Sequence, residues 1–96
     1  MPEPQRTAIQ VVIQGAGVFV LLSKGRTRAA GSLARAALNK FAALRKTQAR
    51  ALTRVMIPGL QKLLCALIRD EPIDRLAVDR ILTKARALRA FLRVAE

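Results

Sequence analysis

The chain has 96 residues, of which 52% are hydrophobic and 25% charged, and its formal net charge at pH 7 is +12. This length limits it to one domain, and so large an apolar fraction excludes a disordered basic tail, which lacks residues to bury. The single cysteine and the absence of His exclude an intramolecular disulfide and argue against a zinc site. No secretory signal fits the N-terminus, so we expect an intracellular, cytoplasmic protein.

The distribution of charge is one-sided along most of the chain. No Asp or Glu occurs from Pro4 to Arg69, and the same stretch carries twelve Lys and Arg. Such a charge repels itself in a compact fold unless a polyanion neutralises it, which indicates nucleic acid or an anionic membrane surface as partner. Arg outnumbers Lys by 13 to 5, and Arg can form two parallel hydrogen bonds to one phosphate. A GC-rich or overlapping reading frame is the alternative explanation of the Arg content.

The N-terminal part consists of a short lead and an apolar segment. We expect residues 1–6 to be extended, because two prolines disfavour a helix there. Residues 7–23 have three interpretations. The segment could be a buried helix, a β-hairpin that turns at Gly15-Ala16-Gly17, or a membrane span. The apolar run 8–22 is short for about 30 Å of hydrocarbon, and we prefer the helix.

The longest predicted helix lies in the middle of the chain. Residues 24–31 are expected to form a basic linker, and Ser32 to cap a helix over residues 32–56. At 100° per residue, an apolar stripe lies on one side of this helix and Lys and Arg lie on the other. Gln48 falls inside the apolar stripe, where it either sets the register between partner helices or reaches the rim.

Two shorter segments complete the predicted fold. Pro58-Gly59 ends the long helix, and residues 60–69 form a short apolar helix. Asp70 is expected to cap a C-terminal amphipathic helix over residues 72–94, with Phe91 on its apolar face and four cations opposite: Arg75, Arg86, Arg89 and Arg93. We therefore predict an all-α fold, a small helical hairpin or bundle of three to four helices that is completed by dimerisation.

The basic side of helix 32–56 is the candidate functional site. Its predicted nucleic-acid-binding residues are Arg35, Lys40, Lys46, Arg50 and Arg54, and Arg28 joins them if the helix begins that early. From Arg35 to Arg54 this side extends about 28 Å, close to the ~34 Å of one duplex turn. The alternative is a solvated helix face, but such faces usually mix both signs of charge.

The aromatic content indicates which part of a nucleic acid is bound. The chain has no Trp and no Tyr, and we assign its three Phe to the core, so stacking on bases is not expected. Contact with phosphate and sugar is independent of base sequence. Double-stranded RNA is recognised mainly by its shape and backbone, although double-stranded DNA offers the same electrostatics.

No enzymatic site is expected. The clustered acids Asp70, Glu71, Asp74 and Asp79 are explained by their position at the start of a helix, where carboxylates complement the macrodipole. There is no combination of nucleophile and base, so we expect a non-enzyme with no catalytic residue, metal site or cofactor.

Three short strings resemble one known family. Leu38-Asn39-Lys40, Thr53-Arg54-Val55-Met56 and the string from Ala66 to Glu71 resemble the small RNA-silencing suppressors of nodaviruses, over about a third to a half of the chain. The resemblance implies an all-helical antiparallel dimer that lays a basic face along double-stranded RNA, with Lys40 and Arg54 as phosphate contacts. The chain departs from this family in its apolar N-terminal segment and in its basic C-terminal helix, where the family has a polar tail.

The functional expectation is sequence-independent binding of a duplex nucleic-acid backbone by a homodimer, with double-stranded RNA favoured and suppression of RNA silencing as a role. One alternative is a membrane-associated protein in which residues 8–22 insert and the basic helix lies on anionic headgroups. Another is a structural component of a ribonucleoprotein or virion.

Overall fold

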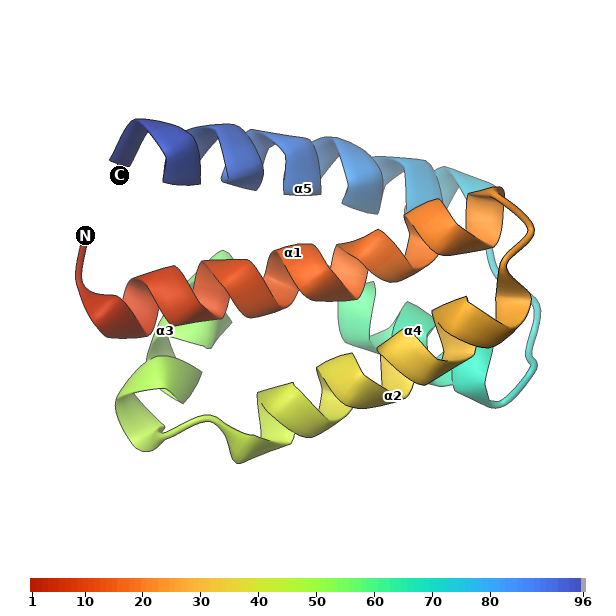
Figure 1. Cartoon of the computed structure of the whole chain (residues 1–96), viewed down its shortest axis with the longest axis horizontal. Coiled ribbons are helices and arrows are strands. Elements are labelled where there is room, and N and C mark those ends of the chain that lie inside the picture. Colours follow the sequence, from red (N-terminus) through yellow and green to blue (C-terminus); the bar gives the residue numbers. More distant parts are fainter. Residues whose placement is uncertain (96) are drawn as a thin grey trace.

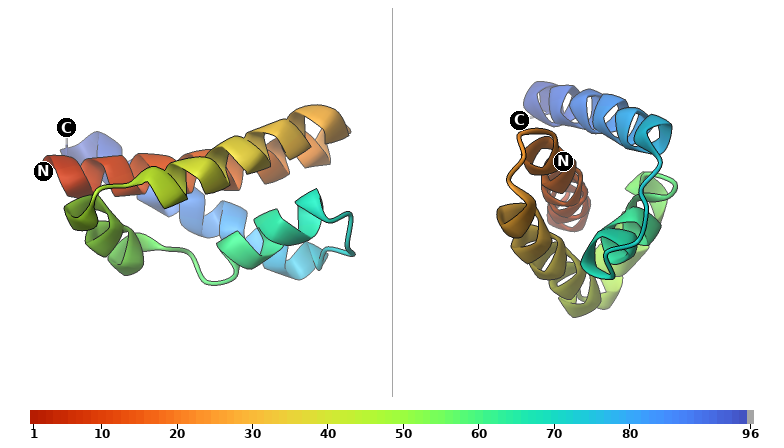
Figure 2. Two further views of the ribbon diagram at one scale, coloured as in Figure 1. Left: turned by 90° about the horizontal axis from the view of Figure 1, so that it is seen from below. Right: turned by 90° about the vertical axis from the view of Figure 1, so that its right-hand side faces the viewer.

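Five α-helices build the part of the chain that the computed structural model describes, residues 1–95. They are α1 (Glu3–Ser23), α2 (Thr27–Ala43), α3 (Lys46–Val55), α4 (Leu60–Ile68) and α5 (Arg75–Ala95). The other four helices all contact α1, which runs through the middle of the bundle (Figure 1; Figure 2). The all-α class is confirmed. The bundle has more helices than the three to four predicted, and dimerisation is not shown.

The apolar N-terminal segment is the core helix of this bundle. Val12 and Phe19 on α1 are completely shielded from solvent, and Gly15 allows close approach of the neighbouring helices. A Cβ atom at Gly15 would lie 3.4 Å from side-chain atoms of both Leu60 and Phe41. The helical interpretation of residues 7–23 is therefore confirmed, and the hairpin is wrong. By length and composition α1 is also apolar enough to cross a membrane, a property that buried core helices share.

The helix starts earlier than predicted, and the extended lead over residues 1–6 is wrong beyond Pro2. Pro2 is extended (φ −61°, ψ 145°) and precedes α1, whose first turn contains Pro4. A proline is tolerated in the first turn because its missing N–H has no intrahelical partner there.

The linker after α1 is also shorter than predicted. Lys24 to Arg26 make the turn, with Gly25 in the left-handed region at φ 75°. The predicted linker over residues 24–31 and the predicted cap at Ser32 are both wrong, because α2 already begins at Thr27. Ala30 is completely buried against the core, and this burial offsets the cost of about 1 kcal/mol for a glycine inside the helix.

The predicted helix over residues 60–69 is confirmed as α4, but the start of the last helix differs. Asp70 has φ 56° and lies at the end of α4, so it does not cap α5. Asp74 takes this role, since its Oδ1 accepts the N–H of Leu76 at 3.1 Å. The last helix therefore begins at Arg75, after the predicted start at Pro72.

Only one side of α5 is covered. Ile81 and Ala85 are buried against the core, whereas Phe91 is 51% and Leu76 66% exposed. The assignment of Phe91 to the core is wrong. Phe91 lies about 80° around the helix from Ile81, and α5 packs mainly on α1, so no second helix covers that side.

Candidate nucleic-acid interface

The six predicted nucleic-acid-binding residues lie on two separate helices. Arg28, Arg35 and Lys40 belong to α2, and the α3 residues are Lys46, Arg50 and Arg54. All six side chains are exposed. Between the helices, Leu44 and Arg45 are extended, with ψ angles of 140° and 161°. The single rod predicted over residues 32–56 is wrong, so its length of about 28 Å no longer describes the site.

Neither glycine nor proline marks this interruption, where a local hydrogen bond and contacts to a distant residue meet. The N–H of Arg45 donates to Oε1 of Gln48 at 3.0 Å, and this bond stabilises the start of α3. The guanidinium of Arg45 pairs with Glu3 at 3.3 Å. Glu3 stands in the first turn of α1, far away in the sequence, so helical periodicity alone could not reveal the break.

Gln48 completes this cluster. It is only 8% exposed, and its Nε2 donates to Oε1 of Glu3 at 2.8 Å. This bond joins α3 to the first turn of α1 within one chain. A register-setting role of Gln48 between partner helices stays a prediction. Hydrogen bonds from Thr7 and Gln48, together with the charge of Arg45, hold the pKa of the Glu3 carboxyl below its ordinary value, although desolvation acts in the opposite direction.

The cations of α2 do not share one face. Arg28 and Arg35 lie on the same side, away from the buried residues Ala34 and Phe41. Lys40 is rotated about 140° from Arg35 and faces α1, where its Nζ donates to Oε1 of Gln14 at 2.8 Å. Lys40 therefore borders a shallow hollow between α1 and α2 and does not extend the row of Arg28 and Arg35.

The cations of α3 are better organised. Lys46, Arg50 and Arg54 follow one another at four-residue intervals, on the side of the helix opposite Gln48 and Leu52. We call these three residues the α3 basic stripe. It spans about 12 Å at a rise of 1.5 Å per residue, and all three side chains are free to reach a ligand.

Little of the positive charge is neutralised within the described residues. Over residues 1–95 there are two ion pairs, Arg45 with Glu3 at 3.3 Å and Arg69 with Glu71 at 3.9 Å. Both are exposed, and exposed pairs contribute little to stability. The net charge of +12 therefore acts on the solvent around a bundle with a radius of gyration of only 12.9 Å.

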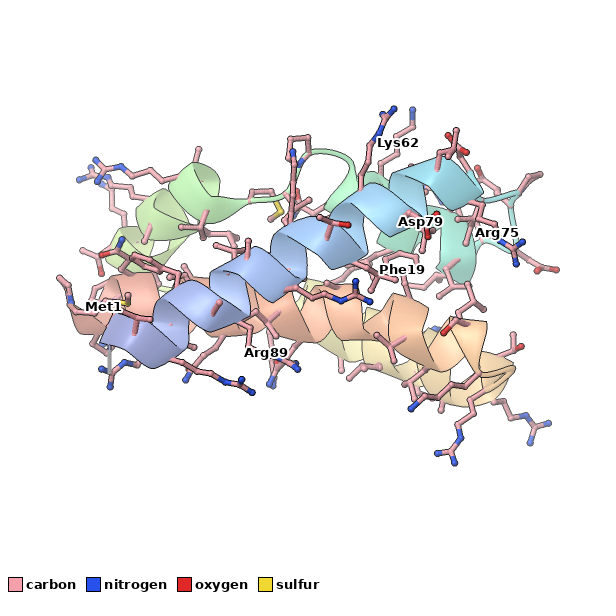
Figure 3. The ribbon with its side chains drawn as sticks, turned by 90° about the horizontal axis from the view of Figure 1, so that it is seen from above. Met1, Phe19, Lys62, Arg75, Asp79 and Arg89 are labelled. Carbon is pink, nitrogen blue, oxygen red and sulfur yellow. The ribbon has the colours of Figure 1, made fainter. Side chains whose placement is uncertain are left out.

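Other cations, outside the predicted set, also border hollows of the surface. Arg86 and Arg89 line a cavity of about 110 Å³ between α5 and the side of α1 that carries Gly17. The sequence placed both residues on the side opposite the apolar face of their helix, but they lie at its border. Figure 3 places Arg89 and Lys62 on opposite long sides of the molecule and Arg75 near one end. The cations thus surround the bundle, and the α3 basic stripe is one ordered part of this surface.

Comparison with other proteins identifies no relative from which a function could be inferred. The chain matches no protein-family model, no curated protein and no solved structure. The resemblance to the nodavirus suppressors stays a prediction that depends on three short strings. The function is therefore inferred from the exposed cations and their arrangement.

Proposed function

We propose that this chain binds the phosphate backbone of duplex nucleic acid without reading the base sequence, with double-stranded RNA as its preferred ligand. One observation carries the proposal: exposed Lys and Arg side chains surround a folded helical body and almost all lack a carboxylate partner within residues 1–95. A polyanion relieves the mutual repulsion of such charges, and the release of its counterions provides the driving force for binding.

The α3 basic stripe is the proposed centre of the contact. Its three cations lie within about 12 Å on one side of a single helix, so they can reach neighbouring phosphates together. Arg28 and Arg35 offer a second contact on α2. Because Leu44 and Arg45 interrupt the helix, the two contacts act as separate groups and not as one continuous row.

Contact with the backbone is favoured over contact with bases. Phe19 and Phe41 are buried, and the chain has neither Trp nor Tyr. Only Phe91 offers an exposed ring, whereas proteins that bind single strands stack successive bases on several aromatic side chains. Recognition of double-stranded RNA through its shape and backbone needs no aromatic platform.

The test is a set of parallel gel shifts with duplex RNA, duplex DNA and single strands at about 50 to 200 mM salt. For duplex DNA, the slope of log K against log salt concentration is expected near −3 if only the α3 basic stripe engages, and near −5 if all six predicted residues do. An affinity that does not change with salt, or tighter binding of single strands than of duplexes, overturns the proposal.

Three other expectations stay open to experiment. Membrane insertion of residues 8–22 would remove Val12 and Phe19 from the centre of the bundle, and flotation with anionic vesicles tests it. A role in a ribonucleoprotein or virion predicts that RNA increases the helical signal in circular dichroism. The homodimer is tested by sedimentation. A single chain already covers most of α1, so a second copy would have to cover other apolar side chains, and those left exposed include Leu76, Phe91 and Val94.

A further inference from the structure

Two hollows lie side by side between α5 and the helices α3 and α4. One has a volume of about 450 Å³ and lies between α4 and the start of α5, where its lining includes Lys62, Leu63, Arg69 and Ala77. The other, of about 370 Å³, lies between the end of α3 and the middle of α5, where its lining includes Arg54, Met56, Lys84 and Leu88.

The two hollows are distinct but adjoin each other along α5. The first includes Gly59 and the second includes Pro58, which are neighbours in the chain. On α5, Ala77 and Lys84 are seven residues apart and therefore lie on the same side of the helix. From Ala77 to Leu88 the two hollows together follow α5 for about 17 Å. We call the pair the α5 groove.

The chemistry of the α5 groove is that of an apolar floor between basic rims. Met56, Leu63 and Leu88 contribute apolar surface, and the rims carry Arg54, Lys62, Arg69 and Lys84. Phe91 lies one turn beyond Leu88 and extends the apolar surface toward the end of α5. The carboxylates of the groove, Glu71 and Asp74, are confined to the end near the start of α5, and Glu71 is paired with Arg69.

We propose that the α5 groove binds an amphipathic α-helix of a partner protein, with apolar side chains on one face and Asp or Glu on both flanks. A helix of about 11 residues matches the length of the groove, and apolar anchors three and four residues apart would fill its floor. Nucleic acid has no side chains to bury on this floor. A second copy of the chain would bring a further charge of +12 against basic rims, so charge complementarity selects an acidic partner.

Arg54 belongs to both the α5 groove and the α3 basic stripe, so the test of this inference uses the full chain without nucleic acid and its outcome does not depend on the nucleic-acid proposal. The probe is a fluorescent synthetic peptide of about 15 residues with Leu at helical spacing and Glu on both flanks; the control is a scrambled peptide of the same composition. Fluorescence anisotropy is expected to show saturable binding of the amphipathic peptide and at least tenfold weaker binding of the scrambled one. Equal binding of both peptides, or none up to about 1 mM, overturns the proposal.

Two matched pairs of variants locate the peptide. Lys84→Glu reverses a charge on the rim and should weaken binding about threefold to tenfold, whereas Arg93→Glu, on the opposite side of α5, should change it less than twofold. Ala87→Trp fills the groove from an exposed position and should abolish binding, whereas Ala36→Trp on α2 should not.

The folded state of each variant is checked by circular dichroism. Peptide binding that both groove variants leave unchanged would place the peptide elsewhere and overturn the proposal. If sedimentation without peptide shows a dimer, and Ala87→Trp disrupts that dimer, the groove would instead bind a second copy of the chain.

Discussion

The two long helices of this bundle, α1 and α5, have similar lengths but opposite surroundings. α1 contacts all four other helices, and its Phe19 is fully shielded from solvent. α5 packs mainly on α1, leaves Phe91 half exposed and borders the α5 groove. α1 is both more apolar and more surrounded than α5, and the burial of its aromatic side chain follows from both properties.

The largest expected effect contrasts the two phenylalanines. Phe19→Ala should lower the free energy of unfolding by about 3 to 5 kcal/mol, because it removes buried surface and leaves a cavity in the core. Phe91→Ala removes a half-exposed ring and should cost less than about 1 kcal/mol. Urea denaturation measures both values. Equal losses would mean that α5 is packed as closely as α1.

The next prediction compares two basic surfaces. Replacing Arg50 and Arg54 together by Ala should lower the magnitude of the salt slope for duplex binding by about 2 and weaken all base sequences equally. The matched control replaces Arg75 and Arg93 on α5 by Ala, which removes the same charge outside the α3 basic stripe and should change the slope by less than 1. Equal effects of the two pairs, measured by gel shift, would show that only net charge matters.

Substitutions at two glycines of α1 test how closely the opposite sides of this helix are packed. Gly15 faces Leu60 and Phe41 closely, so Gly15→Leu should overpack this side and destabilise the protein by about 1 to 3 kcal/mol. Gly17 has open space around its Cβ position, so Gly17→Leu should be neutral or stabilising by up to about 1 kcal/mol. Thermal unfolding of the two variants provides the measurement. A larger loss at Gly17 would contradict the loose packing on the α5 side.

The smallest expected effect concerns the contact that joins the start of α1 to α3. The folded-state pKa of Glu3 is lowered by Thr7, Gln48 and Arg45. The stabilising contribution of its carboxylate is therefore fully present above the unfolded value of about 4.3 and is lost as the pH falls through the folded-state pKa. Glu3→Gln should reduce the loss of stability on acidification from pH 6 to pH 3, as followed by urea midpoints. Superimposable pH profiles of the two proteins would show that this exposed cluster contributes nothing.

Local sequence patterns predicted the helices more accurately than their ends. For residues 7–23 the sequence favoured a helix over a hairpin or a membrane span, and Pro58-Gly59 marked the end of a helix, because these signals act within one or two turns. The early starts at Glu3 and Thr27 were missed for a different reason. A first-turn proline is tolerated, and burial of Ala30 supports a helix that contains Gly31.

In the candidate site, too, local sequence patterns predicted some features, and others depend on which helices are neighbours. Its six exposed cations, its basic character and the grouping of Lys46, Arg50 and Arg54 on one side followed from spacing alone. The orientation of Lys40 toward Gln14 did not, because it depends on which helix lies beside α2.

By itself, the sequence determined an all-helical chain with a large unneutralised positive charge, since composition and periodicity act within each segment. Only the tertiary structure decided the interruption at Leu44 and Arg45 and the exposure of Phe91. At the interruption, Arg45 and Gln48 contact Glu3, which is distant along the chain. The exposure of Phe91 reflects the packing of α5 mainly on α1. Contacts between residues far apart in the sequence leave no periodic pattern in it. The sequence therefore predicted one long helix where the structure has two.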